Sequence, residues 1–143
     1  MRITTRGRYA LRASLAMAKL AKNGGPVSIS HLSEQEDISP VFLEQIFLKL
    51  RKAGLIASVR GPGGGFCFAK PLENITVMDI LEASGEDLNI TDCDKHNPCN
   101  RTAECLSHKV WADLSILVND YFAGITLVSL LCKETAKASR KQG

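Results

Sequence analysis

Hydrophobic residues recur at helical spacing over residues 5–21, which predicts an amphipathic first helix. The stretch Asn-Gly-Gly-Pro at 23–26 predicts the end of that helix, because glycine and proline both oppose its continuation. Residues 27–29 then predict a short extended segment. Ser30 is expected to cap a brief second helix that ends near Glu36.

A stronger helix start follows at Ser39-Pro40. A serine side chain accepts a bond from the first free backbone N–H groups, and proline is tolerated in the first turn. Apolar residues then repeat at i, i+3, i+4 and i+7 until about Ala53-Gly54, namely Leu43, Ile46, Phe47 and Leu50. Two helices joined by a tight turn, the second with a polar outer face, predict a helix-turn-helix.

Two β-prone runs, residues 55–60 and 66–69, flank the glycine-rich stretch Gly61–Gly65 and predict a hairpin. Pro62-Gly63 suits the centre of a type II turn, where proline fixes φ and glycine supplies a positive φ. A helix-turn-helix followed directly by a hairpin is a winged helix. The expected fold class is therefore mainly α with one small β-hairpin and a long dimerisation helix.

That dimerisation helix lies in the second half of the chain. Residues 75–84 predict a further helix, residues 85–104 are polar and irregular, and helical spacing resumes at Leu106 with a break expected at 124–126. A heptad-like apolar seam follows, made of Trp111, Leu114, Val118, Tyr121, Ile125 and Val128. So short a chain cannot cover this seam by itself, and we expect a symmetric homodimer.

Four regions result: a winged helix over 1–84, a polar loop with three cysteines over 85–105, the dimerisation and C-terminal helices over 106–136, and a frayed polar tail over 137–143. The chain has 143 residues, 45% hydrophobic and 23% charged, which is typical of a globular protein and excludes wholesale disorder. It holds no apolar run of membrane-spanning length and no secretory signal, so we expect a cytoplasmic protein without membrane contact.

Charge is distributed unevenly along the chain. Residues 1–70 hold 11 Lys and Arg against 4 Asp and Glu, a net +7, whereas residues 71–143 hold 7 against 11, a net −4. We therefore expect the first half to meet a polyanion. No catalytic motif occurs, so neither enzymatic activity nor a small-molecule substrate is expected.

The polar face of residues 39–52 and the wing tip supply the candidate DNA contacts. Gln45 can bond adenine, lysines suit phosphate, and Arg60 suits a narrow minor groove. Glu44 repels phosphate but can accept a bond from cytosine, so it either selects sequence or is simply solvated. The candidate set is Ser39, Val41, Phe42, Glu44, Gln45, Lys49, Lys52, Arg60, Gly61, Pro62, Gly63 and Gly64.

The sharpest chemical signal is a C-x5-C-x5-C-x2-H spacing made of Cys93, Cys99, Cys105 and His108. Three thiolates and one imidazole suit a soft or borderline metal, and the spacing leaves both tetrahedral zinc and an iron–sulfur cluster open. The segment is too polar to bury unligated cysteines, which favours ligation. The other two cysteines, Cys67 and Cys132, are expected to pack among apolar neighbours.

Three stretches resemble one known family: the opening MRITTRGRYALRA, the block LEQIFLKLRKAGLIASVRGPGGGF at 43–66, and the Cys-His spacing followed by Trp-Ala-Asp-Leu at 111–114. Together they are similar, over nearly the whole chain, to the winged-helix bacterial iron–sulfur transcriptional regulators. The ligand set resembles that of members which hold a 2Fe–2S cluster and control genes of iron–sulfur cluster biogenesis. The resemblance thus implies a 2Fe–2S cluster on Cys93, Cys99, Cys105 and His108.

Arg8 and the start of the second helix of the helix-turn-helix bear on that resemblance. A sister branch that senses nitric oxide holds a 4Fe–4S cluster with an N-terminal aspartate from the other subunit, and Arg8 at that position here cannot ligate. The second helix of the helix-turn-helix opens with Pro40-Val41-Phe42, which is more apolar than the serine- and tyrosine-bearing version of the family. A different operator is therefore expected.

The sequence thus predicts a homodimeric repressor that places two reading helices in successive major grooves of a pseudo-palindromic operator. Two rival interpretations use the same ligands: a DNA-binding protein held together by structural zinc, and a small electron carrier without sequence-specific DNA binding. The basic first half and the wing argue against the carrier.

Overall fold

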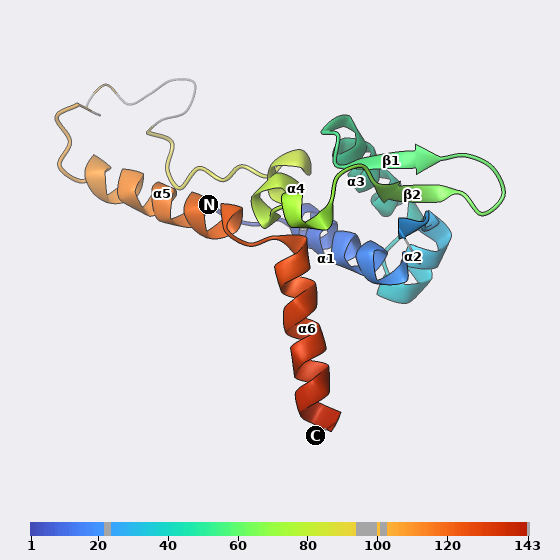
Figure 1. Ribbon diagram of the computed structural model, residues 1–143. Coiled ribbons are helices and arrows are strands. Elements are labelled where there is room, and N and C mark those ends of the chain that lie inside the picture. The colour runs from blue at the N-terminus through green and yellow to red at the C-terminus, as the bar shows by residue number, and fades with distance from the viewer. Residues whose placement is uncertain (22–23, 94–99, 101–102, 143) are drawn as a thin grey trace.

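The computed structural model describes residues 1–21, 24–93, 100 and 103–142, with the side chains of the last helix described as far as Glu134. Its elements are α1 (Thr5–Leu20), α2 (Ile29–Glu36), α3 (Pro40–Lys52), β1 (Ile56–Val59), β2 (Gly65–Phe68), a 3-10 turn (Leu72–Asn74), α4 (Val77–Ala83), α5 (His108–Ala123) and α6 (Leu127–Gln142). This order confirms the expected fold, mainly α with one hairpin after a helix-turn-helix (Figure 1).

One hydrophobic core joins α1 to α4 and the base of the hairpin. The predicted apolar face of α3 is fully buried in it, because Leu43, Ile46, Phe47 and Leu50 are each 0% exposed. Phe47 meets Phe66 of β2 edge to face, with ring centroids 5.3 Å apart. Each such buried side chain contributes about 1.5–3 kcal/mol, so the core fixes the direction in which α3 presents its opposite, polar face.

The hairpin pairs β1 with β2 in antiparallel register, and its turn has the predicted geometry. Gly64 N–H donates to Gly61 O at 2.9 Å, and Gly63 has φ +74°, as the third residue of a type II turn requires. Near the turn end of β2, Val27 pairs with Phe66 as the predicted extended segment. The hairpin is therefore held to the core along β2, while Gly61, Pro62 and Gly63 of its turn are exposed.

The start of α2 differs from the prediction. Ser28 Oγ accepts a hydrogen bond from His31 N–H at 3.1 Å, so the cap is Ser28 and the predicted cap at Ser30 is wrong. This earlier start places Leu32 in the core, where it is 0% exposed. Burial of one apolar residue outweighs the choice between two chemically equivalent caps.

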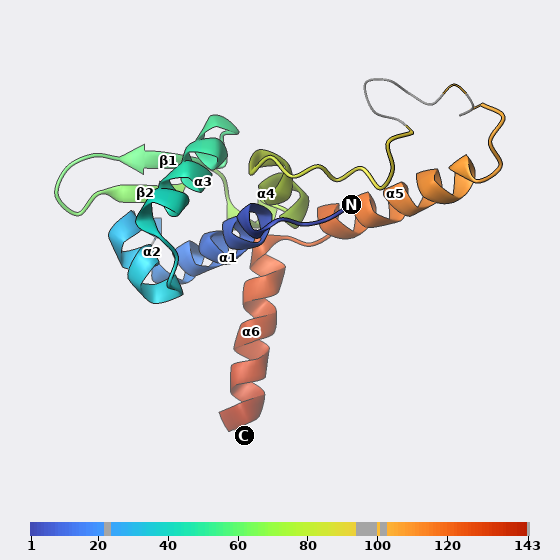
Figure 2. The ribbon, with the colours of Figure 1, turned by 180° about the vertical axis from the view of Figure 1, so that it is seen from behind.

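The last two helices meet at a linker that is bonded to the winged helix. Val77 N–H donates to Ile125 O at 2.9 Å, Leu127 N–H donates to Ile75 O at 3.0 Å, and Leu127 is fully buried. The break predicted at 124–126 is thereby confirmed. From this linker α5 extends to the end of the molecule opposite the wing, and α6 stands away from the body (Figures 1 and 2).

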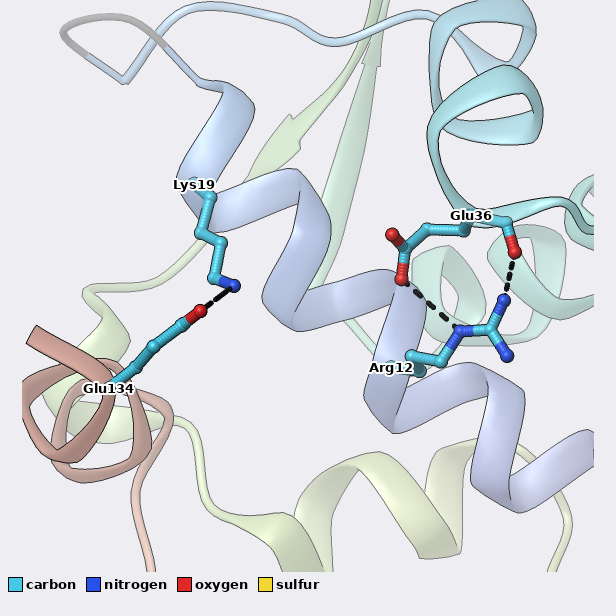
Figure 3. A network of polar contacts seen from close by, with 4 residues as sticks. All are labelled: Arg12, Lys19, Glu36 and Glu134. Atoms are coloured by element: carbon cyan, nitrogen blue, oxygen red, sulfur yellow. Dashed lines mark hydrogen bonds and ion pairs between the residues drawn. The ribbon is translucent and has the colours of Figure 1, made fainter. Parts of the chain in front are cut away.

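Two polar contacts tie neighbouring helices to α1. Lys19 Nζ lies 2.6 Å from Glu134 Oε1 of α6, and Arg12 Nε lies 3.2 Å from Glu36 Oε1 of α2 (Figure 3). Both pairs are at the surface, where each ion pair contributes at most about 1 kcal/mol. They orient α2 and α6 more than they stabilise the fold.

The sequence prediction for α6 is wrong in two respects. The helix continues to Gln142, past the tail boundary predicted at residue 137, because alanine, lysine, arginine and glutamine have high intrinsic helix propensity. Cys132 is exposed, whereas Cys67 is half-buried. Among the helices described, none combines the length and apolarity needed to cross a membrane.

Candidate nucleic-acid interface and metal-binding loop

The outer face of α3 is solvent-exposed along its length. The capping residue Ser39 accepts a bond from Phe42 N–H at 3.5 Å and starts the helix as predicted. The candidate residues that are exposed on this helix and its cap are Ser39, Val41, Glu44, Gln45, Lys49 and Lys52. Since the buried residues of α3 lie on the other side, this face is free to enter a major groove.

Phe42 is the exception among the candidates on α3. It is half-buried and packs edge-on against Tyr9 of α1, with ring centroids 5.7 Å apart. The guanidinium of Arg12 lies 4.9 Å from the Tyr9 ring centre, within the range of a cation–π contact. Phe42 thus joins the first turn of α3 to α1 at the edge of the exposed face.

A groove between the start of α1 and α3 gathers positive charge. It is lined by Arg6, Phe42, Gln45, Ile46, Leu48, Lys49 and Lys52. Clustered cations next to the exposed face attract the phosphates of a duplex. The sequence prediction includes the two lysines but misses Arg6, although the basic opening of the chain carries that signal.

The wing tip presents the other candidate contacts. Arg60, Gly61, Pro62 and Gly63 are exposed and Gly64 is half-buried. A Cβ at Gly64 would lie 2.2 Å from Val59 O, so only glycine fits there. The tip is therefore narrow, with an arginine at its base, which suits entry into a minor groove.

The predicted metal ligands lie around the start of α5. Cys93 is half-buried and Cys105 is exposed, while His108 is the first residue of α5 and half-buried. Cys99 lies outside the described residues. Within the part of the chain that the structure describes, no three candidate ligand side chains come together, so the four-ligand site stays a prediction.

The two ligands nearest α5 have chemistry that fits a metal centre. Cys105 Sγ lies 3.0 Å from Ser107 Oγ, and His108 N–H donates to Cys105 O at 3.2 Å. The pKa of Cys105 is lowered by its bond with the Ser107 hydroxyl and by the backbone N–H groups of His108 and Ser107, because these donors favour the thiolate. The thiolate is the form that ligates metal.

Comparison with known proteins finds relatives that match most of the chain. The IscR transcriptional regulator of Erwinia tasmaniensis is 43% identical over 131 residues, which cover 92% of this chain and 79% of the relative. Among solved structures, T. potens IscR superposes with a TM-score of 0.74 at 28% identity, over 94% of this chain and 88% of its own. CymR, the global cysteine regulator of B. subtilis, gives a TM-score of 0.75 at 27% identity, over 91% and 95%.

The family model named Rrf2 and described as an iron-dependent transcriptional regulator matches residues 3–133. That span takes in nearly all of the winged helix, the loop that carries the predicted ligands, the whole of α5 and the start of α6. Together with the exposed outer face of α3, which we call the reading face, these matches show that the chain belongs to the Rrf2 family of transcriptional regulators.

Proposed function

We propose that this protein is a homodimeric repressor of iron–sulfur cluster biogenesis genes, whose binding to an operator depends on a 2Fe–2S cluster. The ligands would be Cys93, Cys99, Cys105 and His108. The observation that carries the proposal is the position of Cys105 and His108 at the start of α5, a helix in which no residue is buried. The linker that follows its other end is bonded to the winged helix, where Val77 N–H donates to Ile125 O.

The DNA-binding part of the proposal rests on α3 and the wing. Gln45 and Glu44 would read base edges in the major groove, Lys49 and Lys52 would contact phosphate, and Arg60 would enter the minor groove. Ser39, Val41, Phe42 and the wing residues Gly61, Pro62, Gly63 and Gly64 would shape these contacts. The exposure of the reading face and the separate burial of its apolar side support these roles.

The dimer would form through α5. Most of its large apolar side chains are exposed, with Leu117 and Tyr121 each 66% exposed and Ile116 57% exposed, whereas Val118 of the predicted seam is half-buried. A helix that leaves the core and exposes its apolar residues is typical of an interface with a second copy. A twofold pair of winged helices fits a pseudo-palindromic operator with half-sites one helical turn apart.

The ligand loop would act by fixing the path of the chain between the winged helix and α5. Residues 85–107 connect α4 of the winged helix to the dimer helix, so ligation by three cysteines and a histidine along this path would constrain how the reading heads are spaced. When bound, the cluster supplies an iron–sulfide centre whose presence depends on iron, sulfide and redox conditions. Imidazole binds only when neutral, so acid is expected to weaken ligation by His108.

Anaerobic purification tests the cofactor. We expect a coloured protein with near-equal iron and acid-labile sulfide, and loss of both in Cys105→Ser. Cys132→Ser is the matched control, because this exposed cysteine lies outside the ligand set. A colourless protein that contains zinc would refute the cluster and favour the zinc-stabilised alternative, whereas four irons per protomer would favour a 4Fe–4S centre.

Selection from a random duplex pool tests the DNA-binding role. We expect the wild-type protein to enrich a pseudo-palindrome and to bind it more tightly than unrelated duplex by at least roughly 10³-fold. Equal affinity for all duplexes would contradict a sequence-specific repressor.

A further inference from the structure

The segment that leaves α4 toward Cys93 runs beside the N-terminal residues of the chain. The amino group of Met1 lies 3.5 Å from Ile90 O, and Arg6 Nη2 donates to Gly85 O at 3.2 Å. Between these contacts, Glu86 bonds Thr4. Residues 85–90 are thus tied to residues 1–7, which lead into α1.

Glu86 makes the central contact of this junction. Its carboxylate accepts hydrogen bonds from Thr4 N–H at 3.2 Å, from the Thr4 hydroxyl and from Gly7 N–H at 3.0 Å. Glu86 is 8% exposed, so these bonds are formed away from bulk solvent. Thr4 makes no side-chain cap of its own, and a carboxylate from a distant segment therefore caps the start of α1.

The fit around this carboxylate is close. A Cβ at Gly7 would lie 2.6 Å from both Cγ and Oε1 of Glu86. Gly7 is a buried helical residue without a positive φ, so its own backbone gives no reason for glycine there. The reason is the space that Glu86 occupies.

The same junction reaches the reading helix. A Cβ at Gly85 would lie 3.4 Å from Arg6 Nη2 and 3.4 Å from Lys49 Nζ, so a cation of α1 and a cation of α3 both lie beside Gly85. Both cations line the groove beside the reading face. A shift of Gly85 and Glu86 would therefore displace groups that face DNA.

We propose that Gly85 and Glu86 form the joint through which the ligand loop acts on DNA binding, with Glu86 as a positioning residue. Only six residues separate Glu86 from Cys93, so ligation at Cys93 restrains the short segment whose other end holds α1 and Arg6. This inference rests on the proposed function. It adds the contacts through which gain or loss of the cluster by the loop would change the positions of α1 and α3.

The test compares full-length wild type with Glu86→Gln, Gly7→Ala and the matched control Glu82→Gln, an exposed glutamate on α4. For each protein, affinity for the duplex selected by wild type is measured with the cluster loaded and removed. Amide hydrogen exchange of residues 4–8 is measured in both states. Coupled sites typically change affinity about 5–150-fold, and we expect a ratio in that range for wild type and Glu82→Gln.

For Glu86→Gln and Gly7→Ala we expect this ratio to fall to within about twofold of unity, with iron and sulfide content unchanged. In wild type, loading should also change exchange at residues 4–8, and this change should vanish in both variants. The double variant Gly7→Ala, Glu86→Ala removes the clash and guards against misfolding. This double variant should unfold at a higher temperature than Gly7→Ala alone. Its affinities for the duplex with the cluster loaded and removed should still agree within about twofold.

Each of the other possible outcomes would refute a specific part of the proposal. If Glu86→Gln keeps the wild-type ratio although exchange at residues 4–8 rises, Glu86 only stabilises the fold and the joint is refuted. If wild type holds a cluster and binds the duplex but shows equal affinity in both states, the proposed sensing fails and the joint fails with it. If loss of the ratio also occurs in Glu82→Gln, the effect is not specific to this contact.

Discussion

At the scale of single residues, burial separates those that build the fold from those that are free to act. Leu43 and Ile46 are fully buried, whereas Glu44 and Gln45, between them in sequence, are exposed. Glu86 belongs to a third kind, because it is charged and buried and owes its ionisation to specific donors. Two predictions concern side chains of these last two kinds.

The first prediction concerns Glu86 and pH. Burial alone would raise the pKa of Glu86, but hydrogen bonds from the Thr4 side chain, from the backbone of Thr4 and Gly7, and the charge of Arg6 together hold it below its ordinary value of 4.5. A folded-state pKa below the unfolded one stabilises the protein above the unfolded pKa. That stability is lost as pH falls through the folded pKa.

Glu86→Gln should therefore lower the free energy of unfolding by about 1–3 kcal/mol at neutral pH. The difference from wild type should stay constant down to about pH 5 and shrink below the ordinary pKa of 4.5. Denaturant unfolding of the cluster-free protein at fixed protein concentration measures it. A difference that grows toward low pH would contradict the assigned ionisation.

The second prediction concerns phosphate contact by Lys49. Each phosphate contact contributes about 0.9 to the slope of log affinity against log salt, so Lys49→Ala should reduce that slope by about 1 per contact. It should weaken binding to all duplexes by a similar factor. Lys133→Ala, which removes an exposed charge on α6, is the control and should leave the slope unchanged.

At the scale of elements, α5 differs from the four helices of the winged helix, α1 to α4. Helices α1 to α4 each bury part of one face in the common core, whereas α5 has no buried residue. Hydrophobic spacing alone marks both kinds of helix as amphipathic. The two kinds differ in what covers the apolar face: the core of the same chain for α1 to α4 and, in the proposed dimer, a second copy of the chain for α5.

The third prediction tests whether a second copy of the chain covers α5. Leu117→Glu should convert the protein from dimer to monomer, because a charge would be buried in the interface without compensation. Sedimentation equilibrium measures the mass directly, and affinity for the selected duplex should fall with it. Asn74→Glu adds the same charge at an exposed site in the 3-10 turn and should remain dimeric. A dimeric Leu117→Glu protein would place the interface elsewhere.

At the scale of the whole molecule, the wing and the start of α5 lie at opposite ends (Figure 1). The reading face therefore belongs to one end of the protomer and the proposed dimer helix to the other. In a twofold dimer this arrangement sets one fixed distance between two reading heads. DNA sites must match that distance and the helical phase of the duplex.

The fourth prediction follows from the helical repeat of DNA. Inserting about 5 base pairs between the two half-sites of the selected duplex turns them to opposite faces, since the repeat is about 10.5 base pairs. Binding should then fall to the level of unrelated duplex in a gel-shift titration. An insertion that leaves affinity unchanged would indicate that each protomer binds alone.

The sequence alone predicted most of the elements, because each rests on a local signal. Ser39-Pro40 began α3 and Pro62-Gly63 shaped the wing turn, since caps and turns depend on the conformations of a few neighbouring residues. The cap of α2 was misplaced because Ser28 and Ser30 are equivalent locally and differ only in how Leu32 meets the core.

The reading face could likewise be predicted from spacing, but its neighbours could not. Arg6 and Lys49 are far apart in sequence, and only the packing of α1 beside α3 brings them to one groove. Nor does any motif mark Glu86, whose role comes from bonds to residues about eighty positions away.

Local rules thus determined which residues form helices, the wing and an exposed polar face, and they grouped three cysteines and a histidine in one polar segment. Tertiary structure alone decided that a distant carboxylate caps α1, that Gly7 must be small, and that α5 leaves apolar side chains such as Leu117 and Tyr121 exposed. The physical reason is that caps and periodicity act over one turn of chain, whereas burial and buried hydrogen bonds depend on which segments the core brings together.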